Sequence, residues 1–145
     1  MGVNPDAIVR AARSWLGTPY RHQSSVRGAG ADCLGLVRGV WRAVYGDEPE
    51  LAPPYSPDWA EVGGAELMAE AAARHMDRIP NDTRGAGDLL LFRWRGHLPA
   101  KHAAILTAPW RMIHAHEGSG VCEVHLNGWW LRRLAYVFRF PDIES

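Results

Sequence analysis

The sequence lacks several features that would assign it to a class directly. Its 145 residues include only two cysteines, Cys33 and Cys122, which are too few for a disulfide framework and too far apart for a zinc-knuckle motif. Basic and acidic residues balance at 16 each, so net charge predicts no binding to nucleic acid or to an anionic membrane. No stretch approaches the roughly 18 apolar residues of a membrane span, and the N-terminus has no apolar core of signal-peptide length. We therefore expect synthesis in the cytoplasm without a signal peptide, no membrane insertion and no direct contact with nucleic acid.

The composition is that of a packed domain. Hydrophobic residues make up 47% and charged residues 22%, and the seven tryptophans supply large side chains for a core. A chain of 145 residues suits one core and is short for two. We see no internal repeat and no interdomain linker. The sequence therefore predicts a single domain covering residues 1–145.

The N-terminal half carries the signals of three helices. Asn4 is a helix cap followed by Pro5, and apolar residues recur at helical spacing from there until Gly17. A second apolar stripe begins at Cys33 and stops at Gly46. A Gly- and Ser-rich segment between these helices predicts an ordered loop, and a proline-rich segment after them predicts a surface excursion. The loop is residues 17–31, the excursion is residues 47–64, and a third helix is predicted over residues 65–77.

The C-terminal half reads as short strands rich in β-branched and aromatic residues. Short separators at residues 108–109 and 117–120 suit hairpins, which predicts a meander. The class is therefore α+β, with N-terminal helices packed on a C-terminal antiparallel sheet of about five strands. The predicted strands are residues 88–94, 101–108, 111–116, 120–126 and 132–140.

Cys33 is the strongest candidate for chemistry because it opens the second predicted helix. The unpaired amides and the dipole of a helix start lower the pKa of a thiol, and the amide of Cys33 itself is placed to hold an oxyanion. Free cysteines are more often buried and inert, and by itself Cys33 would be interpreted that way. The Gly-rich loop before it and Asp32 beside it favour a nucleophile. Cys122, set among valines, is interpreted as a structural thiol.

Two histidines complete a possible catalytic constellation. His102 opens one predicted strand and His114 lies near the end of the next, so a hairpin brings them side by side. A cysteine nucleophile needs a histidine base that is oriented by a third polar group. Each histidine alone would more often be a surface or hydrogen-bonding residue. A zinc hydrolase built from His102, His114 and His116 is the alternative, although it leaves Cys33 without a role.

These segments together resemble the NlpC-type cell-wall cysteine peptidases over residues 7–126. The similarity lies in GTPY and DCLGLVRGVW around the cysteine, in GDLLLF, and in the two histidine segments KHAAIL and MIHAHEGSGV. The resemblance implies a papain-like fold with no cofactor, Cys33 as nucleophile, His102 as general base and acid, and His114 as the residue that orients the base. Tyr20 and Asp32 match family positions that contact the substrate.

The resemblance also implies a substrate and a carrier. Family members commonly cleave the bond between D-γ-glutamate and a diamino acid in peptidoglycan stem peptides. His22, Gln23 and Leu34 make the chain more similar to the phage-tail and gene-transfer-particle branch, which implies tail or baseplate proteins as partners and action in the periplasm or cell wall. A non-catalytic structural tail protein and an amidase or acyl-transfer enzyme remain alternatives. The role of residues 47–77, in lining the cleft or in docking a partner, is left open.

Overall fold

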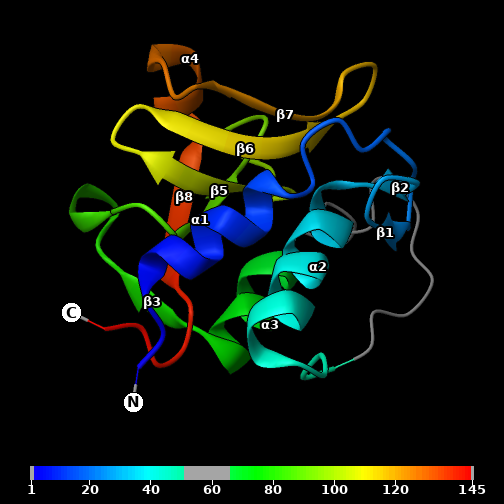
Figure 1. Ribbon diagram of the computed structural model, residues 1–145. Coiled ribbons are helices and arrows are strands. Elements are labelled where there is room, and N and C mark those ends of the chain that lie inside the picture. Colours follow the sequence, from blue (N-terminus) through cyan, green and yellow to red (C-terminus); the bar gives the residue numbers. More distant parts are fainter. Residues whose placement is uncertain (1, 51–65, 145) are drawn as a thin grey trace.

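Helices and strands separate along the chain as the sequence predicts. The computed structural model describes residues 2–50 and 66–144, and Figure 1 shows α1, α2 and α3 lying against an antiparallel sheet. Within those residues the helices are α1 (Pro5–Arg13), α2 (Cys33–Tyr45), α3 (Leu67–His75), the 3-10 turn η2 (Asn81–Thr83) and α4 (Gly128–Leu131). The strands are β1 (Ser25–Val26), β2 (Gly30–Ala31), β3 (Asp77–Ile79), β4 (Leu89–Phe92), β5 (His102–Ala108), β6 (Arg111–His116), β7 (Gly120–His125) and β8 (Leu134–Arg139).

The caps of the first two helices are those expected from the sequence. The Asn4 side chain accepts a hydrogen bond from the Asp6 amide at 2.9 Å, and α1 then ends at Arg13, somewhat before the predicted stop at Gly17. α2 begins at Cys33 and is stopped after Tyr45 by its cap residue Gly46, whose φ of 90° is a left-handed conformation that favours glycine. The predicted boundaries of α2 are therefore confirmed.

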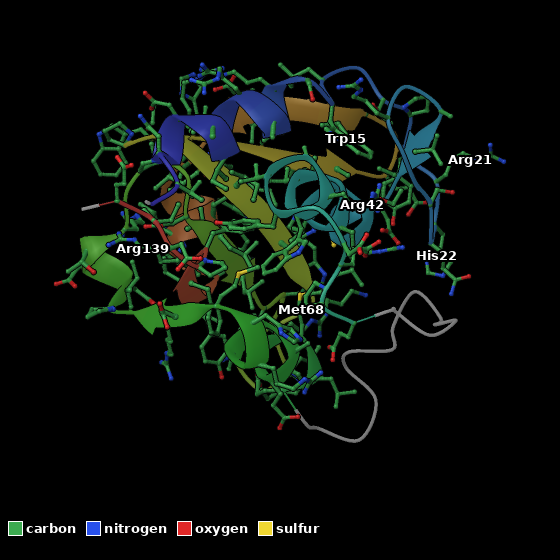
Figure 2. The ribbon with its side chains drawn as sticks, turned by 60° about the horizontal axis from the view of Figure 1, so that its bottom comes forward. Trp15, Arg21, His22, Arg42, Met68 and Arg139 are labelled. Atoms are coloured by element: carbon green, nitrogen blue, oxygen red, sulfur yellow. The ribbon has the colours of Figure 1, made fainter. Side chains whose placement is uncertain are left out.

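A glycine of α2 faces a tryptophan in the turn that follows α1. A Cβ atom at Gly39 would lie 2.0 Å from Cζ2 of Trp15, which is buried between the two helices. Figure 2 shows Trp15 beside these helices and Arg42 directed from α2 toward the β1–β2 hairpin. Arg42 Nη2 donates to the carbonyl and the hydroxyl of Ser25, each at 2.8 Å. Part of the loop predicted over residues 17–31 is thus a small hairpin attached to α2.

The main sheet has six strands in the order β3-β8-β4-β5-β6-β7, all neighbouring pairs being antiparallel. Strands β4 to β7 form the predicted meander. The prediction is wrong for the last strand, because β8 does not follow β7 but returns to pair with β4. β3, which consists of Asp77–Ile79 and pairs with β8, was not predicted. The sheet therefore gains one strand, and β4 becomes interior.

Alternate residues of the strands form two cores on the two faces of the sheet. Leu89 and Leu91 join a cluster with residues of α1, α2 and α3. Leu90 and Phe92 join a second cluster, against which Trp130 of α4 packs. This alternation explains why all four residues of β4 are buried. None of the described helices has the length and hydrophobicity needed to cross a bilayer.

Candidate active site

Cys33 is the first residue of α2, and Asp32 fixes that start. The Asp32 carboxylate accepts hydrogen bonds from the amides of Gly35 at 2.7 Å and Gln23 at 2.8 Å. It therefore caps the helix and attaches the preceding segment to it. The sulfur of Cys33 lies 3.8 Å from the carbonyl oxygen of Lys101, the residue before β5. The helix start is thereby held against the beginning of the strand that carries His102.

His102 and His114 contact each other directly. The Nε2 atom of His102 lies 2.8 Å from Nδ1 of His114, a hydrogen bond in which one imidazole donates and the other accepts. Both side chains are buried. The ring of Trp130 stacks on His102 at a centroid distance of 5.5 Å and meets His114 edge-on at 5.2 Å. Phe92 packs on His102 as well, so both imidazoles are fixed by aromatic contacts.

The hydrogen-bonded pair follows from the register of the hairpin. β5 and β6 pair at Ile105 with Ile113 and at Leu106 with Met112. Continued to the strand ends, this register sets His102 opposite His116 and makes His114 its diagonal neighbour on the same face. The predicted proximity of the two histidines is thus a property of this strand pair.

A cleft of about 230 Å³ contains four of the five predicted site residues. Tyr20, Asp32, Cys33 and His102 line it, whereas His114 lies behind His102 and reaches the cleft only through that residue. His22 also borders the cleft, and Figure 2 shows it at the hairpin side of the molecule. The remaining lining residues are Leu34, Met68, Trp94, Lys101, Ala115, His116 and Glu117.

Several of these lining residues carried little signal in the sequence. Met68 comes from α3, so part of the 47–77 segment borders the cleft, while residues 51–65 lie outside the described part of the chain. Trp94 follows β4, and its ring is 5.1 Å from that of His102. Lys101 was adjacent in sequence to a predicted catalytic histidine, which is a signal that could have identified it. Trp94 and Met68 reach the cleft only through tertiary folding.

A family model described as the NlpC/P60 family matches residues 17–139, which is most of the chain. The chain belongs to the NlpC/P60 family. Comparison with curated protein sequences finds no match.

Solved structures with the NlpC/P60 fold confirm the predicted papain-like α+β class. An NlpC/P60 family protein from Bacillus cereus superposes with a TM-score of 0.69 at 20% identity, over 97% of this chain and 41% of the Bacillus chain. The NlpC/p60 domain of the peptidoglycan hydrolase SagA superposes with a TM-score of 0.66 at 24% identity, over 95% of this chain and 100% of that domain. The peptidoglycan hydrolase RipB from Mycobacterium tuberculosis superposes with a TM-score of 0.63 at 19% identity, over 97% of this chain and 65% of the RipB chain.

Burial keeps the candidate nucleophile of this NlpC/P60 protein protonated. Burial and, after it, the charge of Asp32 raise the pKa of Cys33, while backbone hydrogen bonds from Ala103 and Leu34 lower it; the net value is about 12. The expectation that the helix start would lower this pKa is therefore wrong in its net result. The Leu34 amide lowers the pKa of Cys33, as expected for a helix start, but the cost of burying a thiolate raises this pKa by more.

The histidines are neutral for the same reason. Burial lowers the pKa of His102 well below its ordinary value, and His114 and His116 lower it further. Burial followed by the effect of His116 lowers the pKa of His114 to about 4. A neutral thiol and a neutral imidazole therefore line the same cleft.

Tyr20 and Asp32 form the acidic side of the cleft. Burial is the largest cause that raises the pKa of Tyr20 to about 12, and electrostatic interactions with Cys33, Asp32 and Glu117 act in the same direction, so its hydroxyl remains a hydrogen-bond donor. Asp32 is almost completely buried. Because its two oxygens already hold Gly35 and Gln23, Asp32 has a structural role besides facing the cleft.

The geometry of the histidines does not suit the zinc alternative. A metal ligand needs a nitrogen lone pair directed at the ion, but Nε2 of His102 and Nδ1 of His114 are directed at each other. Their hydrogen bond would have to break before both atoms could bind one ion. Among residues 2–50 and 66–144, no three His, Cys, Asp or Glu side chains are grouped as a metal site.

Proposed function

We propose that this protein is a cysteine peptidase that hydrolyses peptidoglycan stem peptides, with Cys33 as nucleophile, His102 as general base and acid, and His114 as the residue that orients His102. The observation that carries the proposal is one cleft lined by Cys33 and His102, with His114 hydrogen-bonded behind the imidazole. Membership of the NlpC/P60 family supports it. Two proteins with similar folds, SagA and RipB, are peptidoglycan hydrolases, which favours the same substrate here.

The proposed reaction begins from neutral partners. The Cys33 thiol transfers its proton to His102 while the sulfur attacks the carbonyl carbon, so that a carbon–sulfur bond forms and the carbonyl oxygen becomes an oxyanion. The amide of Cys33, one of the helix-start groups without an intrahelical acceptor, donates to that oxyanion. As the carbon–nitrogen bond breaks, His102 returns the proton to the leaving amine. Water, deprotonated by His102, then cleaves the thioester and restores the thiol.

The proposed bond is the one between D-γ-glutamate and the diamino acid of the stem. The test is digestion of purified peptidoglycan with mass spectrometry of the fragments. Wild type should release fragments with a new amino terminus on the diamino acid, and Cys33→Ala should release none while keeping its fold by circular dichroism. Cys122→Ala, a matched control at the other thiol, should retain activity.

Other outcomes would reject the proposal. Full activity in Cys33→Ala excludes Cys33 as the nucleophile. Folded wild type that releases no fragment from any peptidoglycan favours the non-catalytic structural role. Fragments cut at the link between sugar and peptide favour the amidase alternative.

We further propose that the protein is one domain over residues 1–145 and is carried on a phage-like tail. The likeness of the segment around Tyr20 to Cys33 to the tail-associated branch supports this role. It implies tail or baseplate partners and action in the periplasm or wall of the target cell. Mass spectrometry of purified particles should detect the chain in the tail fraction, and its absence from particles would reject this carrier.

A further inference from the structure

A second hollow adjoins the cleft and is lined mainly by arginines. Its volume is about 310 Å³, and Trp94 borders both the hollow and the cleft. The other lining residues come from the segment after β4 and from the connection between α4 and β8. They are Arg93, Arg95, Gly96, Arg132 and Arg133, and we call this region the arginine hollow.

Within the described part of the chain, three of the four arginines of the arginine hollow form no ion pair with a carboxylate. Arg93 pairs with Glu66 at 3.0 Å. In residues 2–50 and 66–144, no ion pair joins Arg95, Arg132 or Arg133 to a carboxylate. The guanidinium of Arg133 is nevertheless held in place, because it lies 3.7 Å from the centroid of the Trp129 ring and donates to the Trp129 carbonyl. The hollow therefore presents ordered positive charge to an anionic ligand.

The proposed chemistry decides which part of a substrate meets this hollow. The general acid must lie next to the leaving amine, and that acid is His102. The ring of Trp94 lies 5.1 Å from that of His102, and the same residue lines the arginine hollow, which His102 does not. The carboxylates of Asp32 and Glu117 line the cleft with Tyr20 and Cys33 and do not line the arginine hollow. The leaving half of a stem peptide consequently extends past His102 toward Trp94, and the acyl half stays near Tyr20.

We propose, on the basis of the function proposed above, that the arginine hollow binds the side-chain carboxylate of the diamino acid and so selects diaminopimelate stems over lysine stems. Diaminopimelate is lysine with one more carboxylate, at the end of its side chain. Guanidinium groups bind carboxylates through charge-assisted and often bidentate hydrogen bonds. The face of Trp94 supplies an apolar wall for the methylene groups that precede this carboxylate.

The test compares two tetrapeptides, L-Ala–D-γ-Glu–X–D-Ala, in which X is diaminopimelate or lysine. Wild type should cleave the diaminopimelate peptide with a kcat/KM about tenfold higher, as expected for charge-assisted bonds at a partly exposed site. The double variant Arg95→Gln and Arg132→Gln changes the two exposed arginines of the hollow. It should lose most of this preference while cleaving the lysine peptide as before. Arg10→Gln with Arg27→Gln removes the same charge from two exposed residues elsewhere and should leave the preference unchanged.

An equal preference in wild type and in Arg95→Gln/Arg132→Gln would overturn the inference while leaving the proposed function intact. An equal loss of the preference for the diaminopimelate peptide in both double variants would also overturn the inference, because such a loss would reflect the net charge of the protein and not the arginine hollow. If wild type cleaves neither peptide, the proposed function fails and binding decides the inference. Calorimetry on Cys33→Ala protein should then show tighter binding of the diaminopimelate peptide that depends on Arg95 and Arg132. Equal binding or no binding of the two peptides would overturn it.

Discussion

Asp32 stabilises the start of α2 and also affects the pKa of Cys33. Its carboxylate caps α2 through the Gly35 amide and holds the preceding segment through the Gln23 amide. The same charge is the second cause of the raised pKa of Cys33, after burial. A change at this position therefore affects helix stability and thiol acidity together, and the two effects are separable only with a substitution that keeps the cap.

Asparagine removes the charge and can still cap α2 by accepting from the Gly35 amide with its carbonyl oxygen, but its NH2 group cannot accept from the Gln23 amide, so that second contact is lost. In Asp32→Asn the pKa of Cys33 should fall, since a negative charge that raises it has been removed. At fixed pH more thiolate is then present, and alkylation by iodoacetamide should be faster than in wild type. The measurement is the alkylation rate at pH 8 in a Cys122→Ser background, followed by intact mass. A rate equal to or slower than wild type would contradict the assigned direction.

The residues that could be predicted from sequence are those with local signals. Cys33 is marked by the Gly-rich loop before it and the apolar stripe after it, and His102 and His114 are marked by the hairpin between them. Trp130, which stacks on both imidazoles, gave no such signal because it lies on a one-turn helix after β7. The net pKa of Cys33 was also not predictable, because burial depends on segments distant in sequence.

The contact between α2 and the turn after α1 depends on the absence of a side chain at Gly39. In most helices Gly→Ala is stabilising by up to about 1 kcal/mol. Here the new methyl group would meet the Trp15 ring at 2.0 Å, so Gly39→Ala should lower the free energy of unfolding by roughly 2 kcal/mol. Urea denaturation checks this value. Gly128→Ala is the matched control, because its nearest atom is the flexible end of Arg132 at 3.2 Å; equal effects of the two variants would contradict this packing.

Elements with strong periodicity were predicted well, and short or returning elements were not. The apolar stripe after Cys33 gives α2 with correct ends. β3 has three residues and depends on β8 for its pairing, so its own sequence does not specify it. β8 could pair with either edge of the β4–β7 meander, and it pairs with β4 rather than with β7. The residues of the hairpin turns do not indicate which of the two edges it joins. α4 needs Asn127 as a cap and the second core as a support.

The whole molecule should lose stability in acid because it buries neutral histidines. The pKa of His114 is about 4 in the folded protein and near 6.5 when unfolded, so the unfolded state binds more protons between these values. The free energy of unfolding should therefore be highest above about pH 6.5 and fall toward pH 4, by on the order of 3 kcal/mol from His114 alone. His102 acts in the same direction.

Denaturation between pH 8 and pH 4 measures this dependence. His114→Asn should flatten the curve, whereas Asn at the exposed His125 should leave its slope unchanged. A His114→Asn curve as steep as that of wild type would show that His114 does not cause the loss.

The two cores have a consequence for the timing of folding. Cys33 packs against the cluster shared by the helices and one face of the sheet, whereas His102 and His114 lie with Phe92 and Trp130 at the other face. The thiol and the imidazole that line the cleft are thus supported by separate hydrophobic clusters. A refolding intermediate with only one cluster formed would contain secondary structure but no paired site. The rate at which the proposed peptidase activity returns after denaturation should therefore equal the rate at which the slower cluster forms. Spectroscopic signals of helix content would not detect that step.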